Sequence, residues 1–338
     1  MKEAKVNAFG RLHFGLVNLS EVGEYINGGA GAMISPPVFS VTASSSSKFI
    51  VFPIRYEGEV RDLCRCLNIT SGLNVRIDLD VRMCQHVGLG FHTQLRLAIA
   101  TAILFALDLS IDTVSLSKTV MRGGTSGIGS LGFWFGGLLF DRGRKRTAVD
   151  DLFLPSSMTK DYDVSPLAYH KNKLPFCLVI VKPAFWEKIY GEKEKDLFEK
   201  LTPIPESETH KCRALIFGDL KQAVVREDFN GFCQALDGIS FVGFKKREIA
   251  YRGERLTEIF ELMRKSGLSG VGMSSWGPIC FGFILNQEDA ENVALRLNCH
   301  TLIEDAWVAE FATGATVQID NGNVVSVFEK ANFRDCDF

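Results

Sequence analysis

Residues 93–108 form a run rich in Ala, Leu and Ile that is apolar almost all round, which is typical of a helix buried on every side. Two glycines, Gly88 and Gly90, stand just before this run. A helix that begins directly after glycines leaves its first-turn N–H groups free, and its dipole adds partial positive charge there. The pattern predicts a buried helix whose N-terminus can hold an anion such as phosphate. A glycine turn that merely starts a helix fits the same residues, because neither a P-loop nor a dinucleotide fingerprint is present.

A helix of this kind needs a large core, and the chain is long enough to build one. Its 338 residues are about right for two domains, and 46% hydrophobic with 23% charged residues is typical of soluble globular proteins. The formal net charge of -2 gives no basic field that would attract nucleic acid or a membrane. No apolar run reaches the roughly 20 residues of a membrane span. We expect a cytoplasmic protein with neither nucleic-acid nor membrane partners, whose nine scattered cysteines are reduced.

Periodicity predicts a mixture of strands and helices. Residues 74–81 alternate apolar and polar side chains, as in a strand with one buried face. Further strands are predicted at 5–19, 38–43, 49–54, 176–181, 280–284, 308–311, 315–319 and 324–328, the last two joined by a hairpin turn at 320–322. Further helices are predicted at 113–120, 186–201, 211–227 and 255–266, and from Asn286 onward. Residues 148–175 lack periodicity and contain prolines, which indicates a domain boundary. This alternation favours an α+β architecture.

Two more segments rich in glycine and serine lie at predicted element ends, where hydroxyls and bare backbone can meet an anionic oxygen. Ser274 and Ser275 precede the strand at 280–284. Ser126 and Gly127 follow Arg122, and an arginine fork can hold a carboxylate or a phosphate. Ordinary loops and a solvated surface arginine fit these segments equally when each is taken alone.

The first predicted strand carries two basic groups on one face. Alternation along a strand places Arg11 and His13 on the same side. Together they could line an anionic pocket, and the exposed face of an edge strand fits the same pattern. The spacing of the other histidines and of the carboxylates identifies no metal ligands.

Taken together, these motifs resemble those of the GHMP kinase superfamily and, within it, the β-ribofuranosylaminobenzene 5'-phosphate synthases. Four segments resemble that family's motifs in order: Arg-Leu-His-Phe-Gly-Leu at 11–16 its opening, His-Val-Gly-Leu-Gly at 86–90 with Thr-Gln-Leu at 93–95 its helix-start loop, Ser-Gly-Ile-Gly at 126–129 with Phe133 its middle motif, and Ser-Ser-Trp-Gly-Pro at 274–278 its late loop. The resemblance covers about the whole length of the chain. Four motifs in the family's order are far more specific than any one of them.

The resemblance implies a two-domain GHMP kinase-like fold of the α+β class. An N-terminal ribosomal-protein-like βα domain would span residues 1–165, and a C-terminal ferredoxin-like α/β plait would span residues 166–338. It also implies that phosphoribosyl diphosphate condenses with 4-aminobenzoate or a similar aromatic acid, with loss of CO2 and diphosphate, in the biosynthesis of a methanopterin-type cofactor. The implied partners are a phosphorylated sugar or nucleotide and an aromatic acid, with Mg²⁺ as cofactor and a homodimer as the assembly.

Such a reaction needs stabilisation of the departing diphosphate and a clamp that aims the aromatic ring at the sugar. The resemblance and the local patterns together suggest Arg11, His13 and Arg122 as catalytic or clamping groups. The suggested phosphate-binding residues are Gly88, Leu89, Gly90, His92, Thr93, Ser126, Gly127, Ser274 and Ser275.

Four positions depart from the family's pattern. Phe91 and His92 follow the glycine loop where the family has small residues, Gln85 replaces a common Pro, and Trp134 stands where an acidic residue is common. Two other functions fit the same residues. An ATP-dependent GHMP small-molecule kinase would use the Ser274 loop, and a non-catalytic binding or regulatory paralogue would result if Phe91 and Trp134 closed the pocket.

Overall fold

The computed structural model describes residues 2–110, 112–147, 153–155, 158–159, 164–184 and 186–330. The strands are β1 (Glu3–Asn18), β2 (Tyr25–Ser45), β3 (Ile50–Phe52), β4 (Leu73–Leu79), β5 (Leu138–Asp141), β6 (Arg144–Lys145), β7 (Leu167–Lys171), β8 (Cys177–Pro183), β9 (Ser269–Met273), β10 (Cys280–Ile284), β11 (Ile303–Phe311), β12 (Thr316–Ile319) and β13 (Val325–Ser326). The helices are α1 (Glu57–Cys66), α2 (Phe91–Ala106), α3 (Thr113–Thr119), α4 (Ile128–Phe135), α5 (Glu192–Leu201), α6 (Glu206–Arg213), α7 (Lys221–Arg226), α8 (Phe229–Ser240), α9 (Gly243–Arg252), α10 (Glu254–Lys265), α11 (Gln287–Asn298) and α12 (Val327–Lys330). A 3-10 turn, η1 (Ile54–Tyr56), precedes α1, and a π-helical segment, η2 (Ala214–Leu220), joins α6 to α7.

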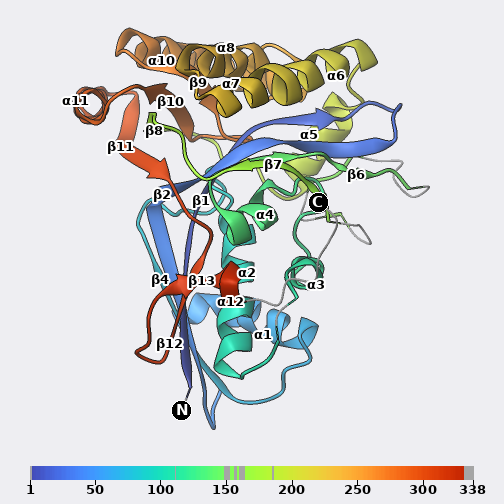
Figure 1. The fold of residues 1–338 in the computed structure, drawn as a ribbon, viewed down its shortest axis with the longest axis vertical. Coiled ribbons are helices and arrows are strands. Elements are labelled where there is room, and N and C mark those ends of the chain that lie inside the picture. Colours follow the sequence, from blue (N-terminus) through green and yellow to red (C-terminus); the bar gives the residue numbers. More distant parts are fainter. Residues whose placement is uncertain are drawn as a thin grey trace.

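The sheet is built around one long antiparallel hairpin of β1 and β2. The ordered path through the sheet is β13-β12-β1-β2-β11-β8-β10-β9, and β2 also pairs with β4, β5 and β6. Helices α6 to α10 gather at one end of the molecule, whereas α1 to α4 lie along the other part (Figure 1). The expected α+β class is therefore confirmed.

Helix α2 is enclosed as the sequence predicts. All of its 16 residues are buried except His92 and Thr93, and the helix packs against β1 and β2. These two residues stand in the first turn, so the helix leaves the core only at its N-terminus. Within the described part of the chain, no helix has the length and apolar character needed to cross a membrane.

Several predicted element bounds need correction, and the reasons are local. The strand predicted at 38–43 is one half of the longer β2, and the strand predicted at 49–54 ends at Phe52, after which η1 begins. The helix predicted from residue 186 begins only at Glu192, because Gly191 has a φ of 62° and interrupts the helical backbone. The strand predicted at 324–328 ends at Ser326, whose hydroxyl accepts a hydrogen bond from the Phe328 N–H and starts a helical turn.

The structure also contains elements that periodicity did not predict. They are α1, α4, α8, α9, β5, β6, β7 and β9. The predicted helix at 211–227 is a continuous helical stretch made of α6, η2 and α7. Of the predicted boundary segment, residues 148–152, 156–157 and 160–163 lie outside the described residues. The division into domains at residue 165 stays a prediction, and the backbone ladder between β2 and β11 joins the two halves.

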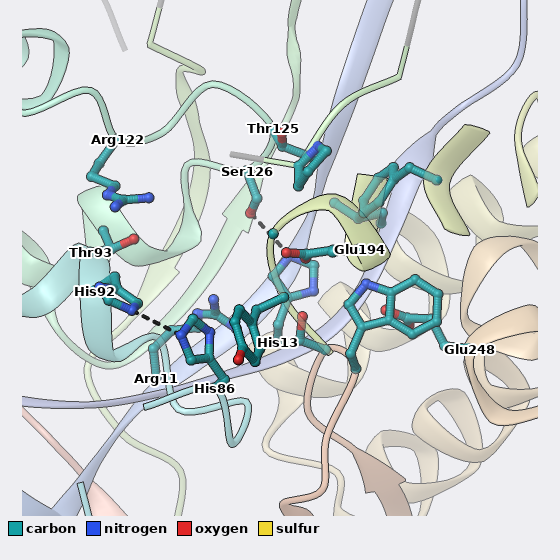
Figure 2. Close-up of a pocket in the computed structure, with 17 residues that line it drawn as sticks. Arg11, His13, His86, His92, Thr93, Arg122, Thr125, Ser126, Glu194 and Glu248 are labelled. Carbon is teal, nitrogen blue, oxygen red and sulfur yellow. Dashed lines mark hydrogen bonds between the residues drawn. The ribbon is translucent and has the colours of Figure 1, made fainter. Parts of the chain in front are cut away.

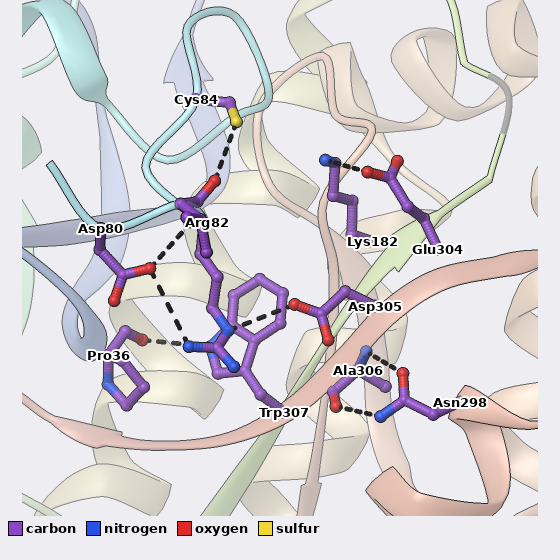
Figure 3. Close-up of polar contacts among 11 residues, drawn as sticks. Pro36, Asp80, Arg82, Cys84, Lys182, Asn298, Glu304, Asp305, Ala306 and Trp307 are labelled. Carbon is purple, nitrogen blue, oxygen red and sulfur yellow. Dashed lines mark hydrogen bonds and ion pairs between the residues drawn. The ribbon is translucent and has the colours of Figure 1, made fainter.

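A cluster of four residues, called the clasp here, reinforces this junction: Pro36, Arg82, Asp305 and Trp307 (Figure 3). Strands β2 and β11 share only two paired positions, Glu310 with Ser35 and Phe311 with Ile34. Next to them, the Trp307 indole N–H donates to the carbonyl of Pro36 over 3.2 Å. The Arg82 guanidinium lies 5.4 Å from the Trp307 ring centroid and donates to the Asp305 carboxylate over 3.2 Å. The clasp thus joins the segment after β4 and strand β2 to β11.

Replacing Trp307 by Phe should keep the ring in the clasp but remove its N–H donor. We expect the free energy of unfolding to fall by about 1 kcal/mol, because the Pro36 carbonyl loses its partner. Trp186→Phe is a matched control, since the Trp186 indole nitrogen has no hydrogen-bond partner among the described residues. Urea denaturation of both variants measures the difference, and equal stabilities would exclude an energetic role for the Trp307 N–H.

Candidate active site

One cavity of about 430 Å³ collects residues from segments that are far apart in the sequence. Strand β1, the start of α2, the segment before α4, helices α5 and α9, and the loop after β9 all reach it. Its polar lining includes Arg11, His13, His86, His92, Thr93, Arg122, Thr125, Ser126, Glu194, Glu248 and Ser275 (Figure 2). Folding therefore brings residues from all four sequence motifs into one cavity.

The predicted site residues divide into three groups. Arg11, His13, His92, Thr93, Arg122, Ser126 and Ser275 line the main cavity. Gly88, Leu89 and Gly90 line an adjoining hollow of about 130 Å³, which shares Arg11, His92, Thr93 and Ser275 with the main cavity. Gly127 and Ser274 line neither space.

The glycine loop lies close against two other segments. Gly88 has a φ of 96°, and a Cβ there would lie 2.5 Å from the carbonyl oxygen of Ser274. Gly90 has a φ of 71°, and a Cβ there would lie 3.0 Å from the side chain of Arg11. Both positions therefore need glycine. No described side chain caps the N-terminus of α2, whose first-turn N–H groups have no partner within the helix, and residues 88–93 at this end line the hollow beside Arg11.

Ser274 holds the loops together from behind the cavity. Its hydroxyl accepts a hydrogen bond from the His13 N–H over 2.9 Å and donates to the carbonyl of Gly88 over 2.7 Å. The side chain is fully buried. Ser275, in contrast, lines the cavity, and its N–H donates to the His13 carbonyl. Of the two adjacent serines, Ser274 therefore binds the protein, and Ser275 can face a ligand.

Gly127 is also occupied by the protein. Its N–H donates to the carboxylate of Asp141, which accepts a second bond from the Gly143 N–H over 2.9 Å. Asp141 is fully buried, and burial raises its pKa to about 6. This carboxylate anchors the segment that presents Ser126 to the cavity.

Arg11 is the strongest indication of an anion site. Its Nε and Nη1 atoms are buried and have no hydrogen-bond partner among the described residues. Burial lowers its pKa to about 10, against the opposing effect of Glu194 and Glu248, so the guanidinium is still charged at neutral pH. A buried cation with unsatisfied donors is costly unless an anion completes it. Phosphate and carboxylate are the anions that suit its planar fork.

His13 lies beside Arg11 and contacts the middle motif. Its Nε2 and the Ser126 hydroxyl oxygen lie 3.0 Å apart in a hydrogen bond. Burial, together with the charges of Arg11 and Lys245, holds the pKa of His13 well below its usual value. The imidazole is therefore neutral at pH 7 and can orient the hydroxyl of Ser126.

Sequence reasoning missed a pair of imidazoles at one side of the cavity. The Nε2 atoms of His86 and His92 lie 3.3 Å apart, and the Tyr190 ring stacks on His86 with 4.1 Å between centroids. Burial, with the Arg122 charge, lowers the pKa of His92 to about 4. Both imidazoles are therefore neutral and can share one N–H. His86 stood in a recognised motif, but nothing in the sequence linked it to Tyr190.

Two carboxyl groups in the cavity were also missed. Glu248 forms a buried ion pair with Lys245, with 2.5 Å between Oε2 and Nζ, and Lys245 also donates to the carbonyl of Ser275 over 3.1 Å. Glu194 makes no hydrogen bond or ion pair with a described residue. Burial, followed by the charge of Glu248, raises the pKa of Glu194 to about 7. The cavity thus combines cationic and anionic groups.

Phe91 and Trp134, the two aromatic residues that depart from the family's pattern, leave the main cavity open. Phe91 is buried in the core, with its ring 6.3 Å from that of Phe39. Trp134 is buried beside Phe133 on α4. Neither residue lines the main cavity, whereas Phe91 lines the adjoining hollow at the glycine loop. Among the described residues, no group of three or more His, Cys, Asp or Glu side chains is placed to hold a metal ion.

Comparisons with known proteins identify relatives over most of the chain. The family described as GHMP kinases C terminal matches residues 220–302. The beta-ribofuranosylphenol 5'-phosphate synthase of Archaeoglobus fulgidus is 31% identical over 308 residues, 88% of this chain and 95% of that protein. The protein of the same name from Methanocaldococcus jannaschii is 28% identical, over 81% of this chain and 87% of its own.

Solved structures show the same fold. The phosphomevalonate kinase of Streptococcus pneumoniae superposes with a TM-score of 0.66 at 13% identity, over 92% of this chain and 100% of that chain. Together with the match to the GHMP kinase C-terminal family, this superposition confirms the expected GHMP kinase-like fold.

The two adjacent serines give a matched test of the geometry. Ser274→Ala should lower the free energy of unfolding by about 1–3 kcal/mol, because two buried backbone groups lose their partner. Ser275→Ala should change it by less than about 0.5 kcal/mol, since the Ser275 hydroxyl makes no hydrogen bond with a described residue. Chemical denaturation measures both values. A larger loss for Ser275→Ala would reverse the two roles.

Proposed function

Because the chain belongs to the beta-ribofuranosylphenol 5'-phosphate synthase family, we propose that it joins phosphoribosyl diphosphate to an aromatic acid, with release of diphosphate and CO2. The expectation of an enzyme of this family is confirmed. The relatives' name specifies a phenol product. We therefore propose 4-hydroxybenzoate as the aromatic acid, in place of the 4-aminobenzoate expected from the motifs. We also propose that this reaction belongs to the biosynthesis of a methanopterin-type cofactor.

The unpaired guanidinium of Arg11 beside the start of α2 carries this proposal. As the bond between the anomeric carbon and the diphosphate oxygen breaks, negative charge develops on the diphosphate. Arg11 and the first-turn N–H groups are placed in advance to stabilise this charge. The hydroxyls of Thr93 and Ser126 face the same space and can donate to further phosphate oxygens.

The bonds that form and break in the proposed reaction set further requirements for the cavity. The ring carbon that carries the carboxylate attacks the anomeric carbon as diphosphate leaves. The carboxylate then departs as CO2, and its bonding electrons restore the aromatic ring. Water would compete for the same anomeric carbon, so the ring must be held close and water excluded. Phe198, Trp276 and Leu16 supply an apolar wall for that purpose. Arg122 is the proposed clamp for the second anionic group, a carboxylate or the 5'-phosphate.

Magnesium fits this cavity as a companion of the diphosphate. The described residues offer no three-ligand cluster, whereas Mg²⁺ commonly keeps several waters and binds substrate phosphates. Thr93 offers a hydroxyl oxygen of the kind found beside nucleotide-bound Mg²⁺. When bound, the ion would neutralise charge on the departing diphosphate.

The other two functions have weaker support. Similarity to kinases at 13% identity concerns the fold alone. A closed, non-catalytic pocket does not suit a main cavity that Phe91 and Trp134 leave open. The homodimer and the cytoplasmic location stay predictions from the resemblance and composition.

The function is tested by product formation. The purified protein with Mg²⁺, phosphoribosyl diphosphate and 4-hydroxybenzoate should release diphosphate and CO2 in equal amounts. 4-Aminobenzoate serves as the second acceptor, and ATP with a panel of small alcohols tests for a kinase. Formation of ADP without diphosphate release from phosphoribosyl diphosphate would favour the kinase and contradict the synthase.

Arg11→Ala should weaken binding of phosphoribosyl diphosphate by about 2 kcal/mol or more, which is roughly 30-fold in Kd. The loss follows because the diphosphate would lose its buried cation. Arg76→Ala on β4 is the control, since Arg76 is exposed, contacts Asp78 and the Phe52 ring, and does not line the cavity. Isothermal titration calorimetry measures both variants. Unchanged affinity in Arg11→Ala would remove Arg11 from the site.

A further inference from the structure

Glu194 is a carboxyl group in the cavity whose role the diphosphate does not explain. It stands on α5 four residues before Phe198, so both side chains lie on one face of the helix, and both line the cavity. Glu248 on α9 is neutralised by Lys245, whereas Glu194 has no hydrogen bond or ion pair with a described residue. A carboxylate in a site for polyanions is unfavourable unless a proton, a cation or a hydrogen-bond donor accompanies it.

The surroundings of Glu194 suit a flat ring. Trp276 lies 6.4 Å from Phe198 between centroids and packs edge-on to Phe244 at 5.5 Å. On another side, Tyr190 stands four positions before Glu194 and stacks on His86. The cavity that contains Arg11 and Glu194 (Figure 2) is also lined by Leu16, Tyr190, Phe198 and Trp276. A ring against this wall therefore shares the cavity with a cation, Arg11, and a carboxyl group, Glu194.

We infer, on the basis of the proposed function, that Glu194 accepts the phenolic proton of the aromatic acceptor and selects acceptors that carry a hydroxyl opposite the carboxylate. As the ring carbon bonds to the anomeric carbon and diphosphate leaves, the phenolic O–H electrons move into the ring and its proton passes to Glu194. When CO2 leaves, its bonding electrons return the oxygen to a phenolate, which takes the proton back. The carboxyl group is therefore regenerated, and no other reactant is needed.

The charges around Glu194 agree with this role. Arg11 and His13 reach the cavity from β1, Arg122 from the segment before α4, Glu248 from α9, and His86 from the segment before α2. Burial and Glu248 raise the pKa of Glu194 to about 7, while the two arginines oppose them. The group can therefore exchange a proton near neutral pH. His86 and His92 have pKa values below the usual 6.5, and their titration lies at lower pH.

The experiment compares two acceptors in wild type and in Glu194→Gln. With 4-hydroxybenzoate, Glu194→Gln should lower kcat by about 100-fold, the lower end for loss of a general base. With 4-aminobenzoate, the decrease should stay below about 10-fold, because a neutral amine donates electrons to the ring without prior loss of a proton. Wild-type kcat with 4-hydroxybenzoate should fall as the pH drops below about 7, since protonated Glu194 cannot act as a base, and this limb should be absent in Glu194→Gln. Glu199→Gln makes the same change on the exposed face of α5 and should leave all values unchanged.

The outcomes are distinguishable. Equal losses with both acceptors, or losses that excess Mg²⁺ restores, would identify a structural residue or a metal ligand and overturn the inference. Unchanged turnover would also overturn it. Glu194→Asp keeps the carboxyl group and should retain the acid limb at a lower rate, so a folding defect in Glu194→Gln does not decide the question. Failure of wild type with both acceptors would instead contradict the proposed function.

Discussion

The enclosure of helix α2 is the constraint on which the site depends. A helix that is apolar almost all round must be surrounded, and the β1–β2 hairpin with its neighbouring helices surrounds it. The helix can meet solvent only at its first turn, where His92 and Thr93 leave the core. The loop before that turn must then pass between Arg11 and the loop after β9, where a Cβ at Gly88 would clash with the Ser274 backbone and one at Gly90 would press on the Arg11 side chain. Hydrophobic burial thus fixes where the free backbone N–H groups lie.

A second level of organisation comes from hydrogen bonds that hold the loops to one another. The Ser274 hydroxyl joins β1 to the glycine loop, and Lys245 holds the loop after β9 through the carbonyls of Met273 and Ser275. The Asp141 carboxylate holds the segment of Ser126 by accepting a hydrogen bond from the Gly127 N–H. These buried hydrogen bonds join protein groups to one another, so they form without a ligand. The groups that face the cavity are therefore held in place before a substrate binds, which lowers the entropy lost on binding.

The sequence predicts those parts of the site that lie in continuous motifs. Arg11, His13, Thr93 and Ser126 all stand in short segments where glycine or strict alternation restricts the backbone, and all four line the cavity. Glu194 could not be found in this way. It belongs to a run of alternating Glu and Lys that is typical of a solvated helix, and only the packing of α5 turns it inward.

Ser274 and Ser275 illustrate the remaining limit of sequence reasoning. Adjacent residues of one type have the same chemistry, and their opposite environments arise from the turn that places Ser275 at a φ of 51°. The same limit applies to where helices and strands begin and end. The positive φ of Gly191 delays the start of α5, and the hydrogen bond that the Ser326 hydroxyl accepts ends β13.

The fold alone does not decide between a kinase and a synthase, since a glycine loop before a buried helix can hold phosphates in either. The chemistry depends on what stands opposite that loop. A phosphoryl acceptor needs its attacking oxygen aligned and a base for its proton. An aromatic ring that attacks through carbon needs, in addition, a flat apolar wall that holds the ring carbon against the sugar. This chain places Phe198, Trp276 and Glu194 in the same cavity as Arg11. Under the proposed function, the apolar side chains that α5 and the late loop add to the cavity suit carbon–carbon bond formation.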